Sequence, residues 1–280
     1  MTIQEKMAKR LMRAFKLVVS VLFLLLPLSC TLSIENKEHR KAQRSLNNSD
    51  YEAALFHFSR VLRKSPESDL ALDSARTAAR VAALHQMDFL RAVEFYRHIV
   101  IYSQNADERR QAQRQIASIE FENLNNYEQA IIEYNRLLKL PHSEAEAYDY
   151  RLAVARSYFR LNNFIQALVE VEEILGYELN DDQVFEATLL KGNLKLTTKQ
   201  LDAAIGIFSD LQEQFPERAR RENLGLNVAV TYEEMEDFAM AISVLETIKN
   251  DYPTPEFIEL KIKRLQERQA NLPGARGPVR

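Results

Sequence analysis

Apolar and polar positions alternate along this chain with the period of an α-helix, and one such stripe occurs six times. In its clearest copy, Asn163–Leu175, apolar side chains stand three, four, seven and ten residues after Phe164. These offsets place them on one face of a helix. A fixed period predicts an array of helical repeats. The lead positions of the six copies lie 37 or 38 residues apart: Tyr51, Phe89, Tyr127, Phe164, Leu201 and Phe238.

Every copy carries an alanine three residues after its lead position. Alanine allows a neighbouring helix to approach closely, without the loss of helix stability that glycine brings. We therefore predict that these residues, called the repeat alanines below, pack where the two helices of a repeat meet. They are Ala54, Ala92, Ala130, Ala167, Ala204 and Ala241.

A second helical segment precedes each stripe, which predicts two helices per repeat. In the last three repeats a small residue, Ala155, Gly192 or Ala229, stands twelve residues before the repeat alanine. This spacing fits two antiparallel helices in close contact across a short turn. Asparagine in several turns tolerates the left-handed conformation that ends a helix. The first helices are expected at residues 38–47, 70–86, 107–124, 143–161, 182–197 and 219–235.

The order of small, aromatic, small and proline positions over residues 38–253 resembles the tetratricopeptide repeat (TPR). That resemblance implies an all-α, right-handed superhelical solenoid of about six helix pairs, whose first helices line a peptide-binding groove. The period exceeds the usual 34 residues of this family by about one helical turn. Residues 254–270 form a further amphipathic pattern, expected to cap the solenoid, and residues 271–280 are expected to be a disordered tail.

The N-terminal segment has the pattern of a signal peptide at residues 1–29. Basic residues precede the apolar run 17–29, which is shorter than the ~20 residues that span a membrane. Ser29 and the single cysteine, Cys30, resemble the end of a bacterial lipoprotein signal. The resemblance implies that Cys30 carries acyl chains such as palmitate and that residues 30–37 are an anchor and tether. An uncleaved anchor and an ordinary cleaved signal are the alternatives.

Thr31 stands where aspartate would resemble an inner-membrane retention signal. The resemblance to lipoproteins therefore points to the outer membrane, with the repeats facing the periplasm.

Charge and composition exclude several classes of function. The formal net charge is −3, and five basic residues against one acidic residue lie in residues 1–30, so the remainder carries −7. This is not the charge of a nucleic-acid-binding protein. The sequence contains no HExxH, GxSxG or glycine-rich phosphate loop. We expect no enzymatic activity, no metal, no cofactor and no small-molecule substrate.

Candidate binding residues lie on the predicted first helices, where they would face the groove. Arg156 and Arg160 are four residues apart on one helix face, a spacing with which two guanidinium groups can hold a carboxylate. The alternative is a solvated arginine pair. The full candidate set is Arg114, Arg156, Arg160, Asn193, Glu233 and Glu234.

The segments Gln200–Pro216 and Asp237–Pro253, with their aromatic–proline endings, are similar to repeats of the TPR lipoproteins of the β-barrel assembly machine and the Tol–Pal system. This similarity implies a periplasm-facing lipoprotein scaffold that binds envelope proteins or peptide segments during outer-membrane protein or envelope-complex assembly. Six repeats behind a lipidated cysteine also resemble the secretin pilotin of type IV pili. A third possibility is an accessory regulator of a peptidoglycan or polysaccharide enzyme.

Overall fold

The computed structural model describes residues 35–271, and every regular element in this range is a helix. These residues form two compact units, which meet in sequence between Gln129 and Ala130. The expected signal peptide, Cys30 and residues 272–280 lie outside the described range. Within it, no helix is both long enough and apolar enough to cross a membrane.

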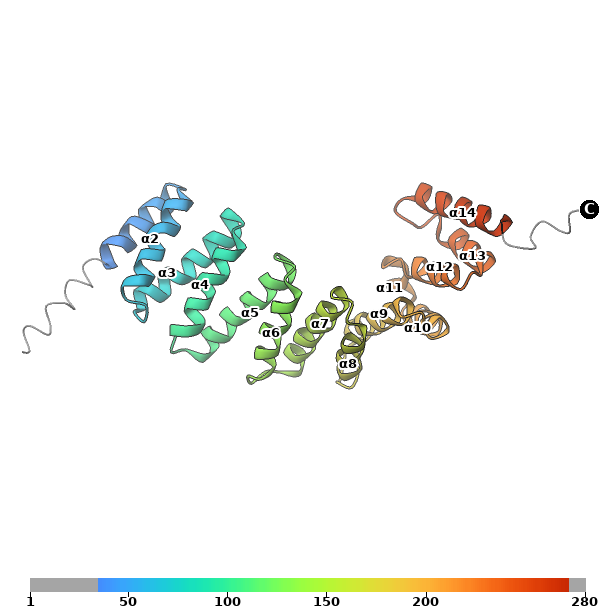
Figure 1. Cartoon of the computed structure of the whole chain (residues 1–280), viewed down its shortest axis with the longest axis horizontal. Coiled ribbons are helices and arrows are strands. Elements are labelled where there is room, and N and C mark those ends of the chain that lie inside the picture. Colours follow the sequence, from blue (N-terminus) through green and yellow to red (C-terminus); the bar gives the residue numbers. More distant parts are fainter. Residues whose placement is uncertain (1–34, 272–280) are drawn as a thin grey trace, which may run out of the picture. The chain divides into compact units, whose positions relative to one another are not determined.

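Unit 1 consists of consecutive helices that each pack on their neighbours along the chain (Figure 1). Its first helix is described from residue 35, and the three described residues before the expected start at Glu38 are already helical. Glu35 is buried and accepts a hydrogen bond from the hydroxyl of Ser68, so residues 35–37 belong to the folded helix pair and not to the tether. The elements that follow are α2 (Tyr51–Lys64), α3 (Asp69–Val81), η1 (Ala82–Gln86), α4 (Phe89–Tyr102) and α5 (Ala106–Glu122).

Unit 2 continues the same pairwise packing, with one interruption. The sixth first helix, expected at 219–235, is divided because Asn223 adopts a left-handed backbone conformation, with φ of 55°. Pro216 begins the short helix before this break, in the first-turn position that proline favours. The boundary between the units falls inside α6 (Tyr127–Leu138). The elements that follow are α7 (Glu144–Arg160), α8 (Phe164–Ile174), α9 (Asp181–Thr197), α10 (Leu201–Gln214), α11 (Pro216–Arg221), α12 (Leu224–Glu234), α13 (Phe238–Ile248) and α14 (Pro255–Ala270).

The turn inside each repeat has one geometry despite a variable sequence. The residue two before each lead position has a positive φ, and the next residue usually caps the following helix by accepting a backbone N–H. Only two of these left-handed residues are asparagines. The six are Ser49, Met87, Asn125, Asn162, Lys199 and Glu236.

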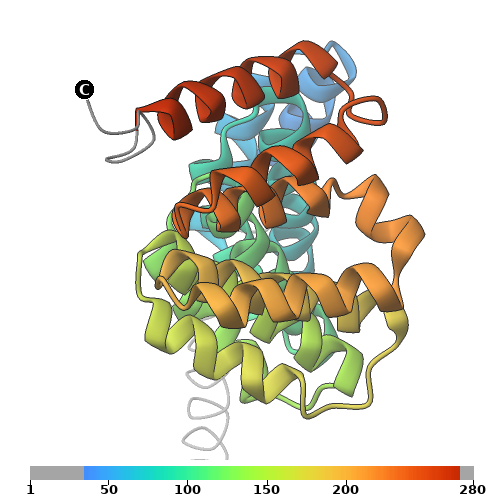
Figure 2. The same cartoon turned by 90° about the vertical axis from the view of Figure 1, so that its right-hand side faces the viewer.

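The six repeat alanines are all fully buried, each with 0% exposed surface. Five of them, Ala54, Ala92, Ala167, Ala204 and Ala241, lie in clusters with large apolar side chains; Ala204, for example, shares a cluster with Phe208 and Phe185. In unit 2 the last repeat is covered by α14, which lies along α13 (Figure 2) and buries Ile258 and Leu265 against it.

Candidate binding groove

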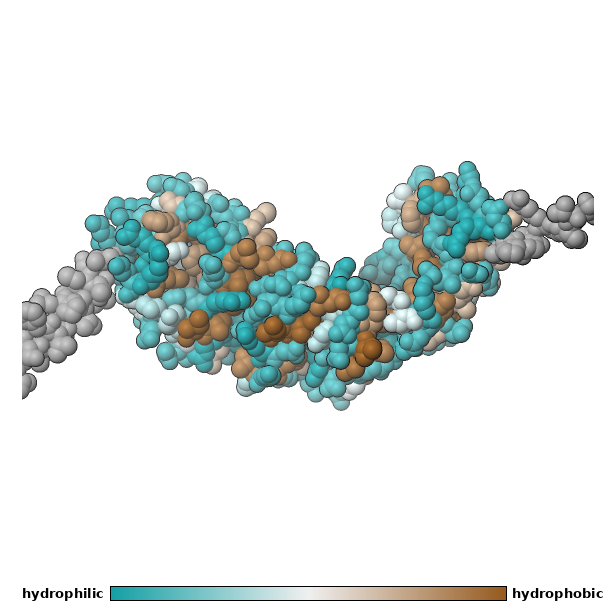
Figure 3. Space-filling model, viewed as in Figure 1, coloured by the Kyte–Doolittle hydropathy of each residue, from teal (hydrophilic) through white to brown (hydrophobic). Residues whose placement is uncertain are grey.

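A groove of about 710 Å³ lies on unit 1, where the first helices of the second and third repeats face each other across α4. We call it the α3–α5 groove. Apolar residues reach the surface among hydrophilic ones over the α4 and α5 region (Figure 3). The residues that line the α3–α5 groove are Arg76, Arg80, Ala83, Leu84, Tyr96, Ile99, Glu108, Gln111, Ala112, Arg114 and Gln115.

Helical periodicity arranges the groove walls. Arg76 and Arg80 are four residues apart on α3, and Gln111 and Gln115 are four apart on α5, so each wall presents a pair of side chains on one face. The floor is apolar because Ile99 of α4 is almost fully buried at the base.

One pair of charges in the groove is satisfied within the protein. Arg76 donates a hydrogen bond to Glu108, and it also lies 3.6 Å from Asp73. The hydroxyl of Ser103 donates to the other carboxylate oxygen of Glu108 at 2.5 Å. The bond from Arg76 holds the pKa of Glu108 below its usual value and raises the pKa of Arg76. This pair is therefore a fixed part of the wall.

Arg80 differs from Arg76 in having no carboxylate partner. Its guanidinium forms no hydrogen bond or ion pair with any residue in the range 35–271. Burial raises the pKa of the neighbouring Tyr96 hydroxyl, and the positive charge of Arg80 opposes this shift. The side-chain amides of Gln111 and Gln115 likewise have no partner among the described residues. The groove thus offers an unpaired cation and unpaired amides to a ligand.

An exposed aliphatic side chain stands beside these polar groups. Leu84, in the π-helical turn η1, is 72% exposed. Together, a free guanidinium, free amides and an aliphatic contact match a peptide segment that carries a carboxylate near an aliphatic side chain.

The predicted carboxylate clamp of Arg156 and Arg160 is not free in unit 2. Arg156 already holds a carboxylate of this chain, Glu186 of α9, at 2.5 Å. Glu186 also accepts a hydrogen bond at 3.0 Å from Tyr148, whose pKa is raised chiefly by burial. Arg160 is exposed at the end of α7 and makes no ion pair within residues 35–271.

The other predicted groove residues of unit 2 are also engaged internally, whereas Arg114 lies in the lining of the α3–α5 groove. Asn193 accepts a side-chain hydrogen bond, and Glu233 and Glu234 form ion pairs. Their partners are Asn227 at 2.7 Å for Asn193, Lys261 and Arg268 at 2.6 Å each for Glu233, and Lys199 for Glu234.

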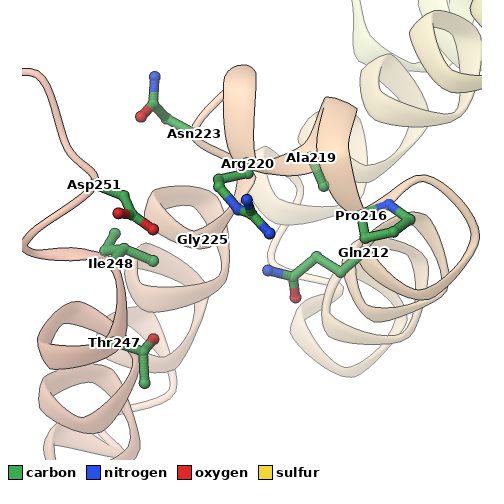
Figure 4. A pocket seen from close by; sticks show the side chains of 9 residues that line it. All are labelled: Gln212, Pro216, Ala219, Arg220, Asn223, Gly225, Thr247, Ile248 and Asp251. Atoms are coloured by element: carbon green, nitrogen blue, oxygen red, sulfur yellow. The ribbon is translucent and has the colours of Figure 1, made fainter.

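A smaller cavity of about 230 Å³ lies in unit 2 beside the break at Asn223 (Figure 4). Arg220 and Asp251 lie on different sides of it and form no ion pair with each other. Gly225 also lines the cavity. It is in close contact with Ile248, since a β-carbon at position 225 would stand 2.6 Å from Cγ2 of Ile248. The cavity is about a third of the volume of the α3–α5 groove, so we place the candidate peptide site in unit 1.

Arg80 is not among the residues predicted from the sequence, although the sequence carries a signal for it. Arg76 and Arg80 have the same four-residue spacing on a first helix as Arg156 and Arg160. Which arginine finds a carboxylate depends on residues about 30 positions away, Glu108 and Glu186, and the spacing alone does not reveal this. Among residues 35–271, no three His, Cys, Asp or Glu side chains are grouped to hold a metal ion.

Comparison with known proteins identifies the fold. No family model matches the sequence, and no curated protein matches it. A TPR protein from Parabacteroides merdae is 20% identical, with a TM-score of 0.54 over 85% of this chain and 88% of that one. YrrB, a TPR protein with an unusual peptide-binding site, is 18% identical, with a TM-score of 0.52 over 74% of this chain and 97% of its own.

This chain has the TPR fold. PilW, described as a widely conserved type IV pilus biogenesis factor, is another solved TPR-like structure of this kind. It is 14% identical to this chain, with a TM-score of 0.54 over 82% of this chain and 98% of its own. The fold agrees with the paired helices and buried repeat alanines of each unit. At these identities the likeness concerns the fold alone.

Proposed function

We propose that this TPR protein is a lipid-anchored scaffold on the periplasmic side of the outer membrane. In this proposal it holds a segment of an envelope protein in the α3–α5 groove during outer-membrane protein or envelope-complex assembly. The helix pairs give a rigid support for such a surface, and the N-terminal pattern ending at Cys30 supplies the anchor.

The observation that carries the binding proposal is the contrast between Arg80 and the other first-helix charges. Arg156, Glu233 and Glu234 are all paired within the chain, so a ligand would have to break an existing ion pair to use them. Arg80 is unpaired and stands in a groove with the exposed Leu84. A ligand carboxylate can accept a charge-assisted hydrogen bond from the unpaired guanidinium of Arg80 without breaking an existing ion pair.

Site-specific photo-crosslinking in cells tests the partner. A photoreactive residue in place of Gln115, inside the groove, should give one dominant adduct, and the same residue in place of Glu94, outside the groove, should not. Arg80→Glu should abolish the Gln115 adduct, and Arg160→Glu should leave it intact. Adducts that persist in Arg80→Glu would contradict the proposed site.

Cell fractionation tests the anchor separately. Cys30→Ser should release the protein from the outer-membrane fraction, because serine at this position does not receive the acyl chains. Each buried CH₂ of such a chain contributes ~0.8 kcal/mol to membrane binding. A Cys30→Ser protein that stays in the membrane fraction would contradict lipid anchoring, whatever the crosslinking result.

A second candidate is the secretin pilotin of type IV pili. PilW, which shares the fold and is described as a type IV pilus biogenesis factor, is the observation behind this second candidate. The crosslinking experiment distinguishes the two: a secretin subunit as the dominant Gln115 adduct supports the pilotin role, and a component of the barrel-assembly machinery supports the assembly role. A cell-wall synthase would instead support the accessory-regulator alternative.

A further inference from the structure

The first helix of unit 1, residues 35–47, carries its basic residues on the face that points away from the protein. Glu38 and Ala42 are buried toward α2, while Lys37, Arg40 and Arg44 are exposed. With 100° per residue, these three cations share the side of the helix opposite to the buried one. The other exposed residues of this side are asparagines, so no acidic residue interrupts it.

None of these three cations pairs with a carboxylate among the described residues. Arg40 donates only to the backbone carbonyl of Asn36, at 3.3 Å. Both acids of the same helix are buried: Glu38 contacts Lys41, His57 and Arg60, and Glu35 accepts a hydrogen bond from Ser68 at the start of α3. All charged residues of the outer face are therefore cations.

The end of α2 adds two more exposed, unpaired cations to the same region, Arg63 and Lys64. Glu38 contacts His57 at 2.8 Å and Arg60 at 3.2 Å. The two helices are joined by a short turn in which the N–H of Asp50 donates to the carbonyl of Ser45 at 2.8 Å, so α2 runs antiparallel to the first helix. The C-terminal end of α2 is consequently next to the N-terminal end of residues 35–47.

The charge of this region is opposite to that of the chain that follows. Residues 35–64 contain seven basic and four acidic residues, and two of those acids, Glu35 and Glu38, are buried. Residues 65–280 contain 25 basic and 35 acidic residues. Positive charge is thus concentrated in the part of the folded chain nearest in sequence to Cys30.

Chain length then constrains where this face can lie. Five residue steps separate Cys30 from residue 35, and a fully extended chain spans at most about 3.6 Å per residue, or about 18 Å here. If Cys30 is anchored in a bilayer, the first helix cannot be far from the headgroups. Electrostatic attraction to an anionic surface is felt within a Debye length of about 8 Å at physiological ionic strength.

We propose that the outer face of residues 35–47, with Lys37, Arg40 and Arg44 at its centre, docks on anionic phospholipid headgroups. This proposal rests on the membrane anchoring proposed above. The docked face acts as a second attachment of the protein to the membrane. The contact fixes the orientation of unit 1 on the bilayer, which an acyl anchor on a single residue does not do.

Vesicle co-sedimentation of a chain that begins at Thr31 tests this contact without the lipid. This chain keeps every described residue. At low ionic strength it should bind vesicles that contain phosphatidylglycerol and not vesicles of phosphatidylcholine alone. Because each basic residue contributes about fivefold to such binding, the triple variant Lys37→Glu, Arg40→Glu, Arg44→Glu should bind at least about tenfold more weakly.

A matched control carries the same change in charge on unit 2: Arg221→Glu, Lys263→Glu and Arg264→Glu. All three positions are exposed and without ion-pair partners among residues 35–271. The control should keep binding within about twofold of the unaltered chain, and circular dichroism should show both triple variants folded. A milder variant, with glutamine at positions 37, 40 and 44, should show an intermediate loss.

Three results would overturn the proposal: no binding of the unaltered chain to anionic vesicles, equal binding to neutral vesicles, or an equal loss in both triple variants. Failure here can be told apart from failure of the proposed function, because partner crosslinking at Gln115 and membrane release of Cys30→Ser use different readouts. Vesicle binding by the chain from Thr31 together with a failed Cys30→Ser test would leave the lipid contact standing and remove the acyl anchor.

Discussion

Gly192 of α9 lies directly against the ring of Phe208 in α10. A β-carbon at position 192 would stand 2.9 Å from Cδ1 of Phe208 and closer still to Cε1. Because Phe208 is fully buried, its ring cannot move into solvent to make room. This contact explains why the position twelve residues before Ala204 holds the smallest residue, and it sets the distance between the two helices.

Gly192→Ala should therefore destabilise unit 2, although alanine is the better helix former. Overpacking of this kind costs roughly 1–3 kcal/mol, which exceeds the gain in helix propensity of about 1 kcal/mol. Urea unfolding followed by circular dichroism measures the change. Gly206→Ala is the control: position 206 is exposed in α10 and a β-carbon there meets no atom within 4 Å. It should stabilise by about 0.5–1 kcal/mol, and a loss of stability in the control would contradict this account.

The repeat alanines make a related prediction. Ala167 has 0% exposed surface and packs in one cluster with Tyr148 and Ala155 of α7. Ala167→Leu should cost roughly 1–3 kcal/mol by overpacking the contact between α7 and α8. The same side chain at the neighbouring exposed position, in Gln166→Leu, should change the unfolding free energy by less than about 0.5 kcal/mol. Equal stability of the two variants would show that the alanine does not set the helix spacing.

Much of the fold follows from the sequence because local periodicity determines it. The stripe in the segment Asn163–Leu175 predicts a helix there, and the structure has α8 over Phe164–Ile174. Prediction fails where one residue changes the backbone. Asn223 interrupts a continuous helical pattern, and the π-helical turn η1 ends a helix whose pattern looks regular. Neither effect alters the hydrophobic period that the prediction uses.

The candidate site could be predicted only in part, for a different reason. Arg114, a candidate groove residue, lines the α3–α5 groove, whereas Arg156, expected to hold a partner's carboxylate or to be solvated, is bound to Glu186 of this chain. Pairing between repeats is a tertiary property, so the spacing of Arg76 and Arg80 does not show that Glu108 binds only the first.

The left-handed turns offer a test of backbone strain. Glu236 has φ of 61°, a conformation that costs a residue with a β-carbon roughly 1 kcal/mol or more. Glu236→Gly should remove that cost, less the entropy that glycine loses on folding, for a net gain of about 0.5 kcal/mol. Asn162→Gly, at the equivalent turn, should gain less because asparagine tolerates this conformation. The two thermal unfolding midpoints measure the difference, and a larger gain at Asn162 would contradict the explanation.

His98 predicts an acid-sensitive contribution to the stability of unit 1. Burial lowers its pKa, and its neutral ring donates a hydrogen bond from Nε2 to the carbonyl of Pro66 at 2.8 Å. The folded state therefore binds a proton less readily than the unfolded state, in which a histidine has a pKa of about 6.5. The contribution is present above this value and is lost as the pH falls below it.

Unfolding free energies at neutral and mildly acidic pH measure this effect. His98→Gln should reduce the loss of stability between these two conditions. His142→Gln is the control, since His142 is exposed. The same pH dependence in His98→Gln as in the unaltered chain would rule out His98 as its source.

Arg80 is the proposed contact that holds a partner segment in the α3–α5 groove. The direct measurement is the affinity of the purified chain for the segment identified by crosslinking at Gln115, with Arg80→Gln compared with Arg160→Gln. Loss of a charge-assisted hydrogen bond of about 1.5–3 kcal/mol predicts at least about tenfold weaker binding for Arg80→Gln and unchanged binding for Arg160→Gln. Unchanged binding by Arg80→Gln, or an equal loss in both variants, would contradict the proposed groove.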